Sequence, residues 1–157
     1  MGEVAKAVLA AGGEVIGVIT QQLVDMELAH PGLTTLHVVD TMHERKARMA
    51  ELADGFIALP GGFGTIEELF EALTWQQLGL HGKPCGLLNV ERYFDKLLEF
   101  LDEMEREQFV QPVDRRMVIS AEEALSLLDQ MNAYQAPSDD KGAWVKEMTN
   151  RIRTASD

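Results

Sequence analysis

The sequence predicts an open, doubly wound α/β domain, in which helices cover both faces of a parallel sheet. Short, almost wholly apolar runs alternate with longer segments of helical periodicity along most of the 157 residues. Such runs are typical of strands that are buried on both faces of a parallel sheet. A glycine-rich turn also leads directly from one apolar run into a helix, as it does at the ligand-binding edge of this architecture.

The first part of the chain predicts a helix, a strand and a loop. Apolar residues recur at helical spacing from Val4 to Ala11, and this helix is expected to end at the glycine pair 12–13. The apolar run 15–19 then predicts a strand that is covered on both faces. Residues 20–33, which end in a proline–glycine pair, are predicted to form a loop.

The next segment predicts a strand followed by a capped helix. The β-branched run 34–39 favours a strand. A helix is expected over 41–53, because Thr41 and Glu44 have the spacing of a capping box, in which the two side chains bind each other's backbone N–H groups. An Asp-Gly pair follows and ends this helix.

The same alternation continues to the last predicted helix. Its strands are expected at 56–59, 85–88 and 116–119, and its helices at 65–80, at 91–107 and from a capping pattern, Ser120 with Glu123, to Met131. Strands that alternate with helices pair in parallel. The prediction is therefore a Rossmann-like domain over residues 1–132. Residues 133–157 are predicted to be a tail, a linker followed by either a weak helix or a disordered end.

The beginning of the chain departs from the usual order of elements. A doubly wound domain opens with a strand and a glycine turn before its first helix, whereas this chain opens inside a helix. The first strand and its glycine loop are therefore expected to be absent from this chain, or to be encoded upstream of Met1.

The composition excludes several classes of function. The chain carries 14 Lys and Arg against 26 Asp and Glu, a net charge of −12, which argues against binding a nucleic-acid duplex. No apolar run of about 20 residues is present to cross a membrane. The single cysteine, Cys85, predicts a reducing, cytoplasmic location. The four histidines lack the spacing of metal ligands, so no metal site is predicted.

The segment 60–68, Pro-Gly-Gly-Phe-Gly-Thr-Ile-Glu-Glu, is the first candidate site. It joins a predicted buried strand to a helix, where free backbone N–H groups and the helix dipole favour an anion. Glycines also let a ligand approach the main chain closely, so phosphate is the natural ligand. The alternative is a plain tight turn, with Thr65 and Glu68 as a capping box.

The run 42–48 is the second candidate site. It begins a helix directly after a strand, so it is expected at the same carboxyl edge of the sheet as the glycine-rich turn. Arg45 carries a planar fork that suits phosphate or ribose oxygens. The alternative is that the charged residues of this run form a solvated helix face.

Together the two segments, Met-His-Glu-Arg-Lys at 42–46 and Pro-Gly-Gly-x-Gly-Thr-x-x-Glu at 60–68, resemble the motifs of the Lonely Guy family, and the similarity extends to about residue 131. Members of this family are cytokinin-activating nucleoside 5′-monophosphate phosphoribohydrolases. The resemblance implies catalytic roles for Arg45 and Glu68. It implies substrate binding by the remaining motif residues, Met42, Lys46, Gly61, Gly62, Gly64 and Thr65. The family's earlier glycine loop, which ends in Gly-Leu-Met-Gly, is represented here only by the first two residues.

The implied reaction is hydrolysis of the N-glycosidic bond of an N6-substituted adenosine 5′-monophosphate, or of AMP itself. The products are the free cytokinin base, or adenine, and ribose 5-phosphate. Glu68 would stabilise the positive charge that develops on the ribose and orient the attacking water. Arg45 would hold the phosphate or the ribose. No cofactor is implied, and activity is expected to be weak or absent if the first glycine loop is missing.

Two other functions are compatible with parts of the sequence. Relatives are often labelled lysine decarboxylases, but that reaction needs pyridoxal phosphate on a Schiff-base lysine, and neither Lys46 nor Lys83 lies in a cofactor motif. A non-catalytic carrier of a nucleotide or cofactor, resembling the molybdenum-cofactor carrier proteins, accounts for the glycine-rich turn without needing Arg45 and Glu68 together.

The helix predicted at 65–80 indicates a subunit contact. One apolar stripe suffices to cover the sheet and consists of Ile66, Leu69, Phe70, Leu73 and Leu80. Trp75 and Leu78 lie on another face, which predicts a homodimer through this helix, as in the family it resembles. The alternative is that Trp75 and Leu78 pack against the helix at 91–107.

Overall fold

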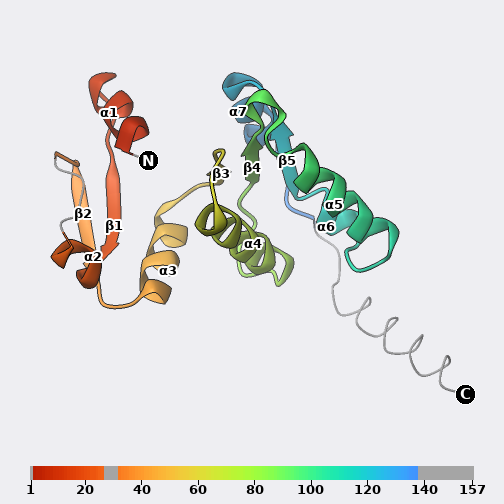
Figure 1. The fold of residues 1–157 in the computed structure, drawn as a ribbon, viewed down its shortest axis with the longest axis horizontal. Helices are drawn as coiled ribbons and strands as arrows, with labels where there is room; N and C mark the ends of the chain where they lie inside the picture. The colour runs from red at the N-terminus through yellow and green to blue at the C-terminus, as the bar shows by residue number, and fades with distance from the viewer. Residues whose placement is uncertain (1, 27–31, 138–157) are drawn as a thin grey trace, which may run out of the picture. The chain divides into compact units, whose positions relative to one another are not determined.

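The structure of the chain, a computed structural model, describes residues 2–26 and 32–137. They belong to two compact units, Met1–Ala53 and Asp54–Asp157. Each unit consists of helices around a parallel sheet (Figure 1), so the predicted α/β class is confirmed. The predicted boundary at residue 132 stays a prediction, and the choice between helix and disorder for 138–157 lies outside the described residues.

The first unit contains a two-stranded parallel sheet, in which Ile16 of β1 lies opposite Thr35 of β2. Its elements are α1 (Gly2–Ala10), β1 (Ile16–Thr20), α2 (Gln21–Asp25), β2 (Thr35–Val39) and α3 (Met42–Leu52). These helices and strands confirm the predicted ones, with one addition. The predicted loop at 20–33 is wrong over α2, where Gln21 Nε2 donates a hydrogen bond to Asp25 Oδ1 at 2.8 Å.

The capping box of α3 is confirmed. Glu44 N donates to Thr41 Oγ1 at 3.1 Å, and Thr41 N donates to Glu44 Oε2 at 3.2 Å. The carboxylate of Glu44 also accepts a bond from Asp40 N at 2.9 Å. Three backbone N–H groups at the start of the helix are therefore satisfied by two side chains.

The expectation that β1 is covered on both faces is wrong. Thr20, at its end, is the one buried residue of this strand, and Ile16 is 49% exposed. Within the unit α2 and α3 contact β1. The three residues between Ile16 and Thr20 are only half-buried, so the apolar run stays partly accessible.

The second unit contains three parallel strands in the order β3-β4-β5. Phe56 of β3 lies opposite Cys85 of β4, and Cys85 lies opposite Val118 of β5. Because the strands are parallel, their carboxyl ends meet at one edge of the sheet. The elements are β3 (Phe56–Ala58), α4 (Phe63–Gln77), β4 (Cys85–Leu88), the 3₁₀ turn η1 (Val90–Arg92), α5 (Asp95–Arg106), α6 (Pro112–Arg115), β5 (Val118–Ala121) and α7 (Ala124–Asn132).

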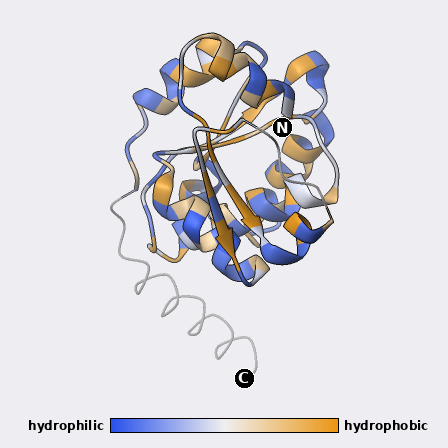
Figure 2. Cartoon of the chain, turned by 90° about the vertical axis from the view of Figure 1, so that its left-hand side faces the viewer, coloured by the Kyte–Doolittle hydropathy of each residue, from blue (hydrophilic) through white to orange (hydrophobic). Residues whose placement is uncertain are grey.

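Helices cover both faces of this sheet, as a doubly wound fold requires. One face packs against α4 and α5 through a core whose buried members are Ala58, Leu69, Ala72, Cys85, Leu87 and Phe94. On the other face α7 lies so close that a Cβ added at Gly86 would be 2.8 Å from Met131 Sδ. The strands are accordingly hydrophobic segments, while the helices carry hydrophilic sides (Figure 2). β3 is less covered, since α7 contacts β4 and β5, and Ile57 is 44% exposed.

The bounds of α4 differ from the predicted 65–80. The helix begins at Phe63, because Gly62 takes an extended N-cap conformation with φ −93° and ψ −152°. It ends at Gln77, and Gly79 follows with a left-handed φ of 76°. Glycine at both ends thus defines the helix.

Other predicted bounds in this unit are also corrected. The helix predicted at 91–107 is divided into η1 and α5, because Glu91 and Arg92 have left-handed backbone angles. β5 occupies 118–121 rather than 116–119, since α6 and the turn after it take up the preceding residues. Ser120 therefore lies inside β5, and α7 begins at an N-cap, Glu123, that makes no side-chain capping bond.

The first residues after α7 pack against the rest of the second unit. Gln76 Nε2, in α4, donates a hydrogen bond to Tyr134 Oη. A Cβ added at Gly82 would lie 3.0 Å from the Cβ of Ala136. Within residues 2–26 and 32–137, none of the helices combines the length and the apolar character needed to cross a membrane.

Candidate active site

The glycine turn (residues 60–64) lies at the carboxyl edge of the β3-β4-β5 sheet, and its last two residues begin α4. Gly62 is the N-cap of this helix, and no side chain caps it. The first intrahelical bond runs from Ile66 N to Gly62 O at 3.2 Å. The backbone N–H groups before Ile66 are those that a helix leaves without an intrahelical acceptor. Since the helix dipole adds positive charge at this end, the turn suits an anion.

The capping-box alternative for this turn is wrong. Thr65 is the third residue of α4 rather than its N-cap, so it cannot form the predicted box with Glu68. The side chain of Thr65 lies over Gly61 instead, and a Cβ added at Gly61 would clash with Thr65 Oγ1. Close packing inside the turn therefore requires glycine at position 61.

Gly62 and Gly64 are not required by packing inside the described chain. A Cβ at either position would meet nothing within 4 Å, and neither residue has a positive φ. They therefore leave open space beside the N–H groups at the start of α4. A ligand that approaches the main chain closely needs such space.

Tyr93 contacts the glycine turn and was missed by the sequence analysis. It follows β4, the neighbour of β3 in the sheet, and its hydroxyl donates a hydrogen bond to Gly61 O at 2.7 Å. The residue is 55% exposed, at the same edge of the sheet as the turn. Its position after a predicted strand was a signal, but the pairing of β3 with β4 was needed to place it beside Gly61.

A buried asparagine organises the turn after β4. Asn89 Oδ1 accepts from Phe94 N at 2.6 Å, and Asn89 Nδ2 donates to Asp95 Oδ1 at 2.9 Å. The hydrogen bond from the Asn89 side-chain amide, together with the nearby Arg92 guanidinium, holds the pKa of Asp95 below its ordinary value. Between these contacts Glu91 and Arg92 have φ values of 50° and 62°. Left-handed angles are costly for residues with a Cβ, so the turn is held in this shape by its contacts.

The first turn of α3 holds the other predicted site residues. Arg45 Nε donates a hydrogen bond to Val18 O, in β1, at 3.2 Å. Arg45 Nη1 lies 3.4 Å from Met42 Sδ. Arg45 and Lys46 are half-buried, so this part of α3 is not the wholly solvated face of the alternative interpretation.

Arg45 belongs to the first unit and Glu68 to the second. Within the second unit, Glu68 is half-buried in the second turn of α4, because the helix begins at Phe63. Its pairing with Arg45 in one site stays a prediction.

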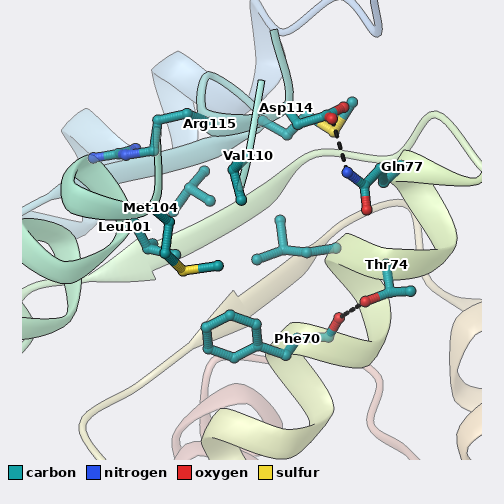
Figure 3. Close-up of a pocket in the computed structure, with 11 residues that line it drawn as sticks. Phe70, Thr74, Gln77, Leu101, Met104, Val110, Asp114 and Arg115 are labelled. Carbon is teal, nitrogen blue, oxygen red and sulfur yellow. Dashed lines mark hydrogen bonds between the residues drawn. The ribbon is translucent and has the colours of Figure 1, made fainter. Parts of the chain in front are cut away.

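A pocket of about 160 Å³ in the second unit contains none of the predicted site residues (Figure 3). It lies where α4 faces α5 and α6, and Gln77 Nε2 there donates a hydrogen bond to Asp114 Oδ2 at 2.8 Å. The α4 residues that line it are Phe70, Leu73, Thr74 and Gln77. The face of α4 toward α5 is therefore not the one that carries Trp75 and Leu78, and Leu78 is 65% exposed.

In the described ranges, no group of three or more His, Cys, Asp or Glu side chains is arranged to hold a metal ion. His30 lies outside these ranges. Burial lowers the pKa of His81 from its ordinary value, which favours the neutral imidazole.

The parallel sheet and its glycine turn define a class of α/β proteins in which ligands bind at the carboxyl ends of the strands. A family model described as "Possible lysine decarboxylase" matches residues 1–131 of the chain. Curated relatives match the chain over most of its length. The chain belongs to this family, the Lonely Guy family whose motifs it carries at 42–46 and 60–68.

Three relatives share the name cytokinin riboside 5′-monophosphate phosphoribohydrolase. One from Arabidopsis thaliana is 46% identical over 140 residues, which are 89% of this chain and 64% of the relative. Another from Arabidopsis thaliana is 46% identical over 146 residues, 93% of this chain and 68% of the relative. One from Rhodococcoides fascians is 55% identical over 120 residues, 76% of this chain and 61% of the relative. The chain thus spans 61–68% of the length of these relatives.

Proposed function

We propose that this chain forms the nucleotide-binding and catalytic part of a phosphoribohydrolase. The enzyme hydrolyses the N-glycosidic bond of N6-substituted adenosine 5′-monophosphates or of AMP, and it releases the free base and ribose 5-phosphate. The observation that carries the proposal is the glycine turn, where uncapped helix N–H groups lie beside the open space at Gly62 and Gly64. The names of the relatives support the choice of substrate.

Each proposed site residue has a role that follows from the chemistry of its side chain or backbone. The 5′-phosphate is bound by N–H and hydroxyl donors of Gly61, Gly62, Gly64 and Thr65. Glu68 stabilises the positive charge on the ribose and orients the water whose oxygen bonds to the anomeric carbon. The electron pair of the broken bond leaves with the base, which takes up a proton. Arg45 holds the phosphate or ribose through its planar fork, and Met42 and Lys46 complete the nucleotide site.

The position of Lys83 in the second unit does not favour lysine decarboxylation. That reaction needs a lysine close to the group that binds the phosphate of pyridoxal phosphate. Lys83 precedes β4 and so lies at the amino edge of the sheet, opposite the edge that holds the glycine turn. The proposed hydrolysis needs only water as co-reactant, so it invokes no cofactor.

The protein is further proposed to form a homodimer and to lie in the cytoplasm. Leu78, the C-cap of α4, is 65% exposed, and a second copy of the chain would cover it together with Trp75. Leu80, which was predicted in the stripe that covers the sheet, instead lies beyond the end of α4 and is 69% exposed. Cys85 is a free, buried cysteine, as expected in a reducing compartment.

Incubation of the purified protein with AMP and with N6-isopentenyladenosine 5′-monophosphate tests the reaction. Chromatography should detect free base and ribose 5-phosphate in equal amounts. The riboside without its 5′-phosphate should give no product, because the glycine turn binds the substrate through the phosphate. Glu68→Gln serves as the blank, since it keeps the size of the side chain and removes its charge. Base release that does not exceed this blank, both in this chain and in a chain extended by the family's first strand and glycine loop, would contradict the proposal.

The same experiment decides between the enzyme and the carrier. Calorimetry measures AMP binding directly, whether or not the base is released. Binding without release would support a non-catalytic nucleotide carrier. Failure to bind any 5′-monophosphate would contradict both the enzyme and a nucleotide carrier.

A further inference from the structure

The Gly61–Gly62 peptide is weakly constrained by its own residues. Glycine on both sides lets the peptide plane rotate at little steric cost. In a trans peptide the C=O and the N–H point in opposite directions, so a rotation would carry Gly62 N–H from one side of the chain to the other. This N–H precedes the first intrahelical bond of α4. Its direction therefore decides whether the turn presents it to an anion.

We propose that Tyr93 is a positioning residue that holds this peptide in one orientation. Its hydroxyl donates to Gly61 O at 2.7 Å. While this bond is made, Gly61 O points toward Tyr93, and Gly62 N–H points to the opposite side. The inference rests on the proposed function, because the N–H held in this way is one that would bind the 5′-phosphate.

The turn after β4 holds Tyr93 firmly enough for this role. Its ring meets the ring of Phe94 edge to face, with centroids 5.0 Å apart at 87°, and Phe94 is 1% exposed in the core. Asn89 in turn fixes the backbone of Phe94 through the bond at 2.6 Å. The left-handed residues Glu91 and Arg92 precede Tyr93, and such angles persist where surrounding contacts over-determine them. The hydroxyl is thus presented by an anchored ring.

Replacing Tyr93 by phenylalanine removes the hydroxyl and keeps the ring. We expect Tyr93→Phe to weaken AMP binding about three- to tenfold, the range of one ordinary hydrogen bond. Adenosine, which lacks the phosphate, should bind as it does to the wild type. Titration calorimetry gives both dissociation constants, and thermal melts establish that the variant is folded. Equal weakening for AMP and adenosine would overturn the proposal, because a general loss of structure would affect both.

The second tyrosine provides the matched control. The chain contains two tyrosines, and Tyr134 accepts its hydrogen bond from Gln76 rather than contacting the glycine turn. Tyr134→Phe should therefore leave the AMP dissociation constant unchanged, even if it lowers the melting temperature. Equal effects of the two variants on AMP binding would overturn the specific role of Tyr93.

A measurement without ligand separates this inference from the proposed function. The amide resonance of Gly62 in a ¹H–¹⁵N spectrum should be sharp in the wild type and broadened by exchange in Tyr93→Phe. An unchanged resonance would overturn the inference, whatever the protein binds. A wild type that binds no AMP would overturn the proposed function, and the Gly62 resonance would still decide whether Tyr93 fixes the peptide. Where AMP does bind, a broadened resonance with unchanged affinity would overturn the proposed consequence.

Discussion

The glycines of the turn serve different purposes, and alanine substitutions separate them. At Gly61 an added Cβ would clash with Thr65, whose own Cβ is 3.0 Å from that position. We expect Gly61→Ala to lower the free energy of unfolding by about 1–3 kcal/mol, as overpacking does. Gly64→Ala should keep or slightly raise stability, because its Cβ enters open space within a helix. It should nevertheless weaken AMP binding. Denaturant unfolding and calorimetry measure both effects, and equal destabilisation by the two variants would contradict this division.

Glu68 and Glu67 are neighbours in α4 and point about 100° apart, so they cannot face the nucleotide in the same way. We expect Glu68→Gln to reduce base release by orders of magnitude at nearly the same melting temperature, because the negative charge stabilises the ribose cation. Glu67→Gln should retain turnover. Arg45→Lys should behave like Glu68→Gln, since lysine keeps the charge and loses the fork. If Glu68→Gln keeps turnover and Glu67→Gln loses it, Glu67 rather than Glu68 is the catalytic residue.

At the scale of elements, capping distinguishes two patterns that look alike in the sequence. Thr41 and Glu44 form both bonds of a capping box, so Thr41→Ala should lower the free energy of unfolding by about 0.5–2 kcal/mol. Ser120 has the same spacing from Glu123 but lies within β5 and caps nothing. Ser120→Ala is therefore the control, and its cost should be smaller. Denaturant unfolding of the two variants checks this order, and a larger loss for Ser120→Ala would contradict it.

The elements themselves were predictable where the pattern was local and continuous. β4 was predicted at its observed residues, because its apolar run is bounded by a Gly-Lys-Pro turn and a polar residue. The start of α4 was not, since a glycine N-cap has no side chain to mark it, and Thr65 with Glu68 imitates a capping box. α2 and α6 were missed because helices this short have little periodicity.

At the scale of the molecule, the candidate site was predictable as far as it is continuous in the chain. The glycine turn and the start of α3 are single segments, and their chemistry follows from residue type and position. The contact of Tyr93 with Gly61 joins residues 32 positions apart. It depends on β3 and β4 being neighbours in the sheet, which residue spacing does not specify. Long-range contacts of this kind follow from strand order rather than from motifs.

The stability of the second unit should depend on pH through its buried thiol. Burial raises the pKa of Cys85 from its ordinary 9.0 to about 12, because the core around β4 disfavours the thiolate. Between these pH values the unfolded chain binds fewer protons than the folded chain, so the free energy of unfolding should fall as pH rises above about 9. Burial also raises the pKa of Tyr134, which acts in the same direction. Urea unfolding at pH 7.5, 9 and 10.5 measures the slope, and Cys85→Ala should flatten it, although its cavity lowers stability at every pH. If the free energy of unfolding falls equally steeply with pH in Cys85→Ala, a group other than Cys85 causes the pH dependence.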